Sequence, residues 1–127
     1  MAQSQSVEKN RNADTVFAFG EYKGTFDPMD YMQVERYENA VAKMTERTQG
    51  AAKLPKESEK LREIALALCD VFDGVFGEGT ADKMLGGTTN LSTIILAYEA
   101  LVKYITARNS AEGKRFAAIA EKYAAQK

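Results

Sequence analysis

The 127-residue sequence contains no histidine and no tryptophan, one cysteine and two prolines. Without imidazole the chain cannot form a serine–histidine or cysteine–histidine nucleophile, nor the usual nitrogen-ligated zinc or iron site. Because Cys69 is alone, an intrachain disulfide and a Cys-x-x-Cys pair are excluded. We therefore expect no catalytic residues, no metal and no cofactor, and we do not expect an enzyme.

Long apolar runs are also missing. The first ten residues, MAQSQSVEKN, lack the apolar stretch of a signal peptide, and no segment approaches the roughly 18 apolar residues of a membrane span. Together with the lone cysteine, these features predict a cytoplasmic protein that has no membrane partner. The composition, 45% hydrophobic and 28% charged residues, is typical of one globular domain.

The formal net charge of −1 hides a polarity along the chain. Residues 27–82 hold twelve acidic and seven basic residues, whereas residues 103–127 hold six basic and two acidic ones. The two regions are therefore expected to attract each other or a neighbouring copy. Because helix C-termini favour Lys and Arg in any case, the basic end does not by itself indicate nucleic acid.

The periodicity of the apolar residues predicts a mainly α fold, in which an N-terminal β-hairpin precedes a three- to four-helix bundle with a long C-terminal helix. The hairpin is expected within residues 15–26, around the break at Gly20 and Glu21. Residues 1–13 are polar and are interpreted as a mobile arm, residues 14–109 as the hairpin and helical domain, and residues 110–127 as a helical extension.

The helix boundaries follow from capping residues. Asp27 is the expected cap of the first helix, with Pro28 at its first position and the apolar stripe Tyr31, Val34, Tyr37, Val41 and Met44 along it, up to about residue 50. The second helix is expected over residues 56–76, and the third begins after Asn90. From there it either continues through Gly113, which we favour, or breaks into a fourth helix.

A glycine-rich corner, FGEGTADKMLGG, separates the second helix from the third. The acids around it lack the spacing of a calcium loop, and no Lys-Ser/Thr pair follows the glycines as in a phosphate loop. The corner is better explained by a stop at Gly77, a short helix capped by Thr80 and a second stop at Gly86 and Gly87. Met84 and Leu85 are then expected to fold back onto the second helix, although a partner-binding knuckle remains an alternative.

Apolar side chains are the candidate functional residues. Cys69 lies among them and is interpreted as a core residue rather than a nucleophile. The residues expected to bind protein or to mediate self-association are Phe72, Phe76, Met84, Leu85, Tyr98 and Phe116.

Two blocks of the chain resemble a known family. The clearer block comprises Phe76, Gly77, Glu78, Gly79, Thr80, Leu85, Gly86, Gly87, Asn90 and Leu91, and the weaker one Glu35, Tyr37, Glu38 and Ala40. Over residues 15–105 the sequence resembles the small helical proteins encoded in tail-gene modules of phages and prophages of Gram-positive bacteria. The resemblance implies a tail assembly chaperone that binds the tape-measure protein, and it brings no catalytic residues.

The sequence thus favours a non-enzymatic phage morphogenesis protein that binds a tape-measure or other tail protein through apolar helical surface and forms a homo-oligomer. The alternative is a virion structural protein, a head or tail completion or connector subunit. A nucleic-acid-binding regulator that uses the basic end is a third reading.

Overall fold

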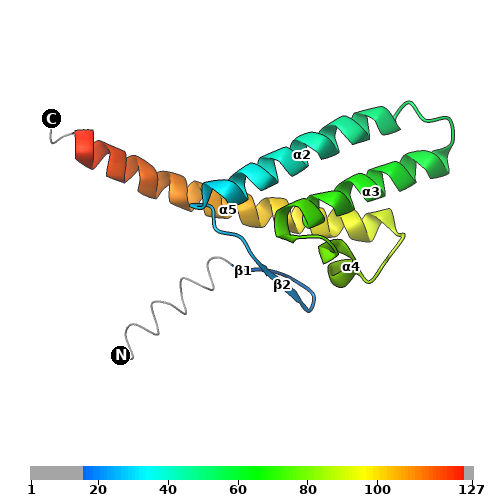
Figure 1. Cartoon of the computed structure of the whole chain (residues 1–127), viewed down its shortest axis with the longest axis horizontal. Coiled ribbons are helices and arrows are strands. Elements are labelled where there is room, and N and C mark those ends of the chain that lie inside the picture. Colours follow the sequence, from blue (N-terminus) through cyan, green and yellow to red (C-terminus); the bar gives the residue numbers. More distant parts are fainter. Residues whose placement is uncertain (1–15, 125–127) are drawn as a thin grey trace.

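The computed structural model describes residues 16–124, apart from the side chains at positions 112, 116, 123 and 124 (Figure 1). The expected arm at residues 1–13 lies outside the described residues. The elements are β1 (Val16–Phe19), β2 (Tyr22–Thr25), α2 (Tyr31–Ala51), α3 (Glu57–Phe76), α4 (Thr80–Leu85) and α5 (Leu91–Ala124). The predicted fold class, mainly α with an N-terminal hairpin and a long C-terminal helix, is confirmed.

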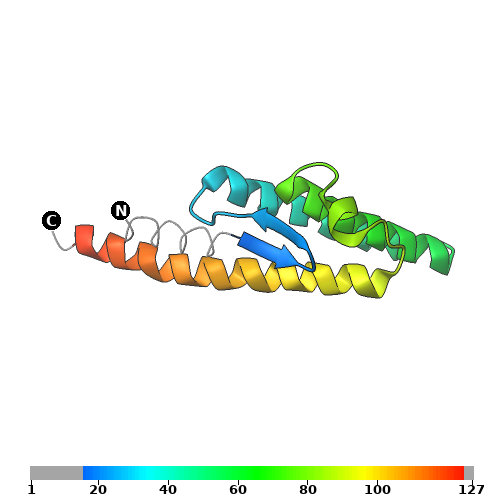
Figure 2. The ribbon, with the colours of Figure 1, turned by 90° about the horizontal axis from the view of Figure 1, so that it is seen from below.

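Helix α3 is the central element of the molecule. It packs along α2 and also contacts α5 and α4, whereas α2 and α5 make few direct contacts with each other. The approach between α2 and α3 is close at Gly74, where an added Cβ would lie 3.1 Å from the Cβ of Ala40. Figure 2 shows the hairpin lying against α5, on which β1 packs.

The hairpin is antiparallel and pairs Phe17 with Gly24 and Phe19 with Tyr22 across the turn at Gly20, whose φ is +59°. Phe17 is 2% exposed and stacks on Phe76 at 5.8 Å between ring centroids. Since an isolated two-stranded hairpin is marginal in water, this contact with the helices is what stabilises it. The predicted hairpin is confirmed.

The start of α2 differs from the prediction. Asp30, not Asp27, is the N-cap, and it accepts a hydrogen bond from the Met32 amide at 3.0 Å. Asp27 instead closes a turn by accepting from the Met29 amide at 2.9 Å. Gln33 ties the two together, because its Nε2 donates to Asp30 Oδ2 at 3.0 Å and its Oε1 accepts from the Asp27 amide at 2.8 Å. Pro28 therefore lies before the helix.

Tyr31 is a second correction. The periodicity predicts that Tyr31 belongs to the apolar stripe of the first helix, but its side chain is 74% exposed. At 3.6 residues per turn, a step of three residues advances about 300° around the helix, which is 60° short of a full turn. The two steps of three residues from Tyr31 to Tyr37 therefore displace the side chain by about 120° around the helix. Tyr31 therefore lies well away from Tyr37 around the helix.

The glycine corner forms the short helix α4 as predicted, with Gly77, Gly79, Gly86 and Gly87 all at positive φ. The expected cap is wrong in detail. Gly79 is the N-cap, and the Thr80 hydroxyl donates to the Gly77 carbonyl at 2.6 Å. Asp73 of α3 supplies the missing acceptor, since its Oδ1 accepts from the Ala81 amide at 2.9 Å.

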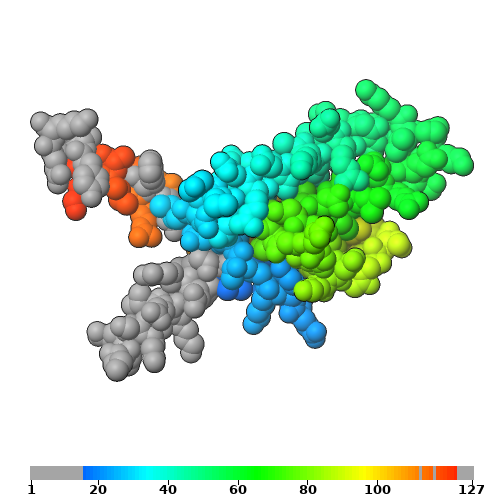
Figure 3. Space-filling model, viewed as in Figure 1, coloured from blue at the N-terminus to red at the C-terminus, as the bar shows by residue number. Residues whose placement is uncertain are grey.

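Helix α5 is continuous through Gly113, as favoured, and Asn90 caps it by accepting from the Thr93 amide at 3.3 Å. Its 34 residues span about 50 Å at 1.5 Å per residue. Ile94, Ala97, Leu101 and Ile105 are buried in the core. From residue 109 onward every described side chain is exposed, so the expected domain boundary at residue 110 falls inside one helix that leaves the body (Figures 1 and 3). We call residues 109–124 the overhang.

Candidate protein-binding surface

Apolar side chains that are only partly covered lie on α2 and α5, next to the side of each helix that faces the core. We call this set the open apolar face: Val34, Tyr37, Val41 and Met44 of α2 with Leu91, Ile95, Tyr98 and Val102 of α5. Seven of these side chains are partly buried, and Ile95 is 37% exposed. The surface exists because both helices pack on α3 without closing on each other.

Two tyrosines give the open apolar face a polar edge. The ring of Tyr37 packs edge to face against the buried ring of Phe26, which is 1% exposed, with 6.1 Å between the ring centroids. Burial raises the pKa of Tyr37, and burial together with the neighbouring Tyr37 raises the pKa of Tyr98. Both phenols therefore stay neutral at physiological pH, and each offers an apolar ring with one hydroxyl to a contacting helix.

The structure places the residues expected to bind protein in different environments. Phe72 is 0% exposed, so it packs the core and supplies no surface. Phe76, Met84, Leu85 and Tyr98 are partly buried and pack against that core, which confirms that α4 folds back onto it. Of these four, Tyr98 lies on the open apolar face. The side chain at position 116, the sixth expected residue, lies outside the described ones.

The corner that carries the family resemblance has a structural explanation for most of its residues. Four glycines adopt positive φ, Thr80 bonds back to Gly77 and Asn90 caps α5. Glu78 is exposed at the turn. The corner therefore fixes how α3, α4 and α5 follow one another, and its contribution to the open apolar face is indirect.

The sequence does not single out most residues of the open apolar face as surface. Tyr37, Met44 and Ile95 stand on regular helical stripes, and a stripe of this kind indicates burial without saying what buries it. No signal in the sequence shows that α2 and α5 make few direct contacts with each other. Leu96 is 60% exposed on another side of α5 by its helical position, and Met29, Tyr31 and Met32 are exposed around the start of α2.

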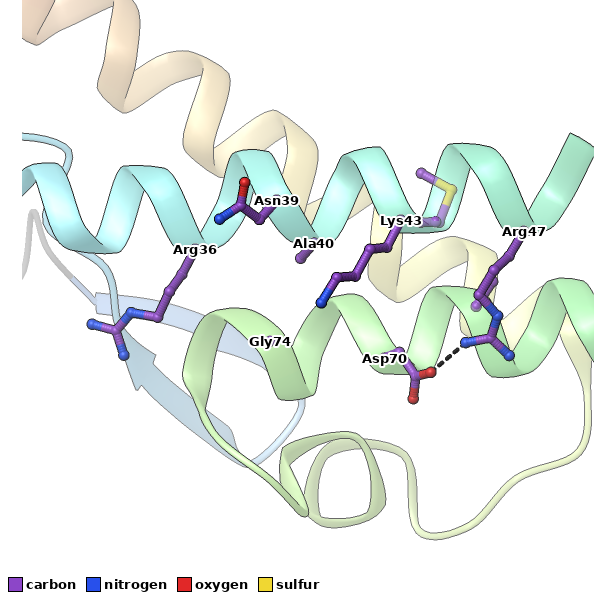
Figure 4. Close-up of a pocket in the computed structure, with 9 residues that line it drawn as sticks. Arg36, Asn39, Ala40, Lys43, Arg47, Asp70 and Gly74 are labelled. Carbon is purple, nitrogen blue, oxygen red and sulfur yellow. Dashed lines mark hydrogen bonds and ion pairs between the residues drawn. The ribbon is translucent and has the colours of Figure 1, made fainter.

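A pocket of about 370 Å³, lined by both charged and apolar side chains, opens between α2 and α3 (Figure 4). Arg47 lies at one end, where its Nε donates to Glu63 Oε1 at 2.9 Å and its Nη1 pairs with Asp70. Lys43 extends over the pocket toward α3, and Arg36 leaves α2 on the same side, toward the end of α3 near Gly74 (Figure 4). Because the Arg47 side chain is about one-third exposed, each of its two ion pairs stabilises the contact between α2 and α3 by only about 0–1 kcal/mol.

Cys69 is partly buried on α3 and free of disulfide bonding. Burial raises the pKa of its thiol, and the carboxylates of Asp70, Asp73 and Asp82 raise it further. A thiol in this environment is held away from the reactive thiolate form. This agrees with the interpretation of Cys69 as a small apolar residue.

Two further findings concern residues 16–124. No helix in this range combines the length and the apolar character that crossing a membrane requires. Within the same residues, no three histidine, cysteine, aspartate or glutamate side chains gather closely enough to hold a metal ion.

Comparison with known proteins gives a family match over most of the chain. Residues 20–127 match a protein-family model described as "Family of unknown function (DUF6673)". No curated protein and no solved structure matches the chain significantly.

Proposed function

The chain belongs to DUF6673, a family of unknown function, and we propose that it is a non-enzymatic protein-binding subunit of phage morphogenesis. Within that class we propose a tail assembly chaperone that holds the tape-measure protein. The proposal combines the resemblance to small helical tail-module proteins with the surface described above.

The observation that carries the proposal is the open apolar face. A tape-measure protein is long, helical and apolar, and an isolated amphipathic helix is soluble only when its apolar side is covered. The open apolar face offers aliphatic side chains and two neutral tyrosines along two helices, which is the surface a client helix requires. Because the underlying core is complete without a client, the subunit can release it without unfolding.

The test is co-expression of the chain with the tape-measure protein of the same phage. We expect wild-type protein to raise the soluble yield of the tape-measure protein and Ile95→Lys to abolish that gain, because the ammonium group would need to be desolvated against the client. Ile95 is already 37% exposed, so the variant should keep its fold and its melting temperature within a few degrees.

Leu96→Lys is the matched control. It makes the same change on the next residue of α5, where the side chain is 60% exposed on another face of the helix, and should preserve the gain in soluble yield. Equal loss or equal retention in the two variants would refute a role for the open apolar face. Recovery of the chain from purified particles at fixed copy number would favour a virion structural subunit over a chaperone.

A further inference from the structure

The basic end of α5 presents one stripe of small and cationic residues. At helical spacing, Ala107, Ala111, Arg115, Ala118 and Lys122 share a face, and all five are exposed. Lys114 flanks this stripe and is also exposed. We call the five residues from Ala107 to Lys122 that share this face, without Lys114, the basic stripe.

Helix α2 carries the complementary pattern. Its outer face presents Tyr31, Glu35, Glu38, Ala42 and Glu46, which share one side of the helix and are all exposed. The cations of α2, Arg36, Lys43 and Arg47, lie instead toward the pocket on α3 (Figure 4). We call the outer set the acidic stripe.

The two stripes match in length and spacing. Each covers sixteen residues, or about 22 Å of helix at 1.5 Å per residue. Read in opposite directions, both have successive spacings of four, four, three and four residues. In an antiparallel pairing Ala42 meets Ala111, which allows close approach, while Glu38 meets Arg115 and the ring of Tyr31 meets the ammonium of Lys122.

A chain cannot make this contact with itself. Helix α5 is straight and its overhang runs away from the body, in the direction opposite to α2 (Figures 1 and 2). Folding the overhang back onto its own α2 would require breaking α5, whose intervening residues continue as helix. The complementary surfaces therefore face outward on one molecule and can meet only between molecules.

We propose that the acidic stripe of one copy binds the basic stripe of a second copy in an antiparallel helix pair. The occupant is a second copy because the complementary charges and the matching spacing are both present in this chain. Arg115 already takes part in an interaction within its own chain, but a guanidinium has five N–H donors and can serve both. The open apolar face is not used, so the proposal is independent of the proposed function.

Two charge-reversal variants test the contact by light scattering after size-exclusion chromatography at low salt. Wild-type protein should exceed the monomer mass of 14.0 kDa and should fall to it at high salt, where exposed charges are screened. Lys114→Glu with Lys122→Glu, and separately Glu35→Lys with Glu38→Lys, should each be monomeric. Both keep the fold, because all four side chains are exposed.

The decisive measurement is the equimolar mixture of the two variants. In the mixture the unchanged basic stripe of one variant meets the unchanged acidic stripe of the other, so assembly should return. The control, Lys53→Glu with Lys83→Glu, makes the same change in net charge as Lys114→Glu with Lys122→Glu, but at exposed positions outside both stripes, and should assemble like the wild type. A monomeric wild type at low salt, or a mixture that stays monomeric, would overturn the proposal.

Failure here is distinguishable from failure of the proposed function. Lys114→Glu with Lys122→Glu leaves the open apolar face intact and should still raise the soluble yield of the tape-measure protein. Ile95→Lys leaves both stripes intact and should assemble as the wild type does. A variant pair that lost both properties together would contradict the assignment of two separate surfaces.

Discussion

Gly24 is the residue at which the hairpin meets α3. A Cβ at this position would lie 2.5 Å from the Tyr22 hydroxyl and 2.9 Å from Cδ1 of Phe76. The two rings themselves meet edge to face, with centroids 6.0 Å apart. A glycine inside a strand normally weakens it, and here the missing side chain makes room for the aromatic contacts that hold the hairpin on the helices.

Gly24→Ala should therefore destabilise the protein. The added methyl must displace Phe76 or Tyr22, and overpacking of this kind costs about 1–3 kcal/mol. Gly50→Ala is the matched control, because a Cβ at Gly50 in α2 meets nothing within 4 Å and alanine is favoured over glycine in a helix by about 0.5–1 kcal/mol. Urea denaturation of both variants checks the difference, and equal stability would mean that the hairpin is not packed at Gly24.

At the scale of elements, α4 depends on a residue of another helix. It has six residues and no side-chain cap of its own, so its orphan amide at Ala81 is satisfied by Asp73 of α3. A helix this short does not persist in water alone. The carboxylate of Asp73 therefore connects the two helices and fixes the turn that leads into α5.

Asp73→Ala should loosen α4 by leaving the partly buried Ala81 amide without its acceptor, at a cost of about 1–2 kcal/mol. Asp73→Asn retains an oxygen at the same place and should lose less than half as much. The measurement is the free energy of unfolding, together with hydrogen exchange at residues 80–85. Faster exchange confined to this segment in the alanine variant is expected, and unchanged exchange would show that α4 is held by apolar packing alone.

At the scale of the whole molecule, the chain consists of a packed body and an overhang. The body is held by Phe72, Leu101 and other side chains with almost no exposed area. The overhang has no comparable contacts among its described side chains, and isolated helices of this length are marginal in water. Its order in solution should therefore depend on what docks against it.

Limited trypsin digestion in dilute, high-salt solution should begin in the overhang. The expected first cuts follow Lys114, Arg115 and Lys122, because local unfolding there costs little and leaves the core intact. Mass spectrometry of the early fragments identifies the order of cleavage. First cuts within α2 or α3 would mean that the body, not the overhang, is the less stable part. At low salt the overhang should be protected to the extent that the two stripes associate.

Much of the fold was readable from residues with strong local preferences. The spacing of Leu68, Phe72 and Val75 predicted the helix α3. Gly77 and Gly86 predicted the ends of α3 and α4, and Asn90 predicted the start of α5. The cap of α2 was less readable, because Asp27 and Asp30 both suit the role locally. Gln33, which bonds to both, decided between them only once the turn was formed.

The amino-acid sequence by itself determined the helices, the hairpin, the corner and the lack of imidazole chemistry, since each depends on residues close together in the chain. The tertiary structure decided which apolar stripes stay open. Tyr37 and Ile95 look like core residues in sequence, and they remain accessible because their helices both pack on α3 and make few direct contacts with each other. It also decided that the basic overhang of α5 runs away from α2 of the same chain. Hydrophobic periodicity marks a face for burial and says nothing about which partner covers it.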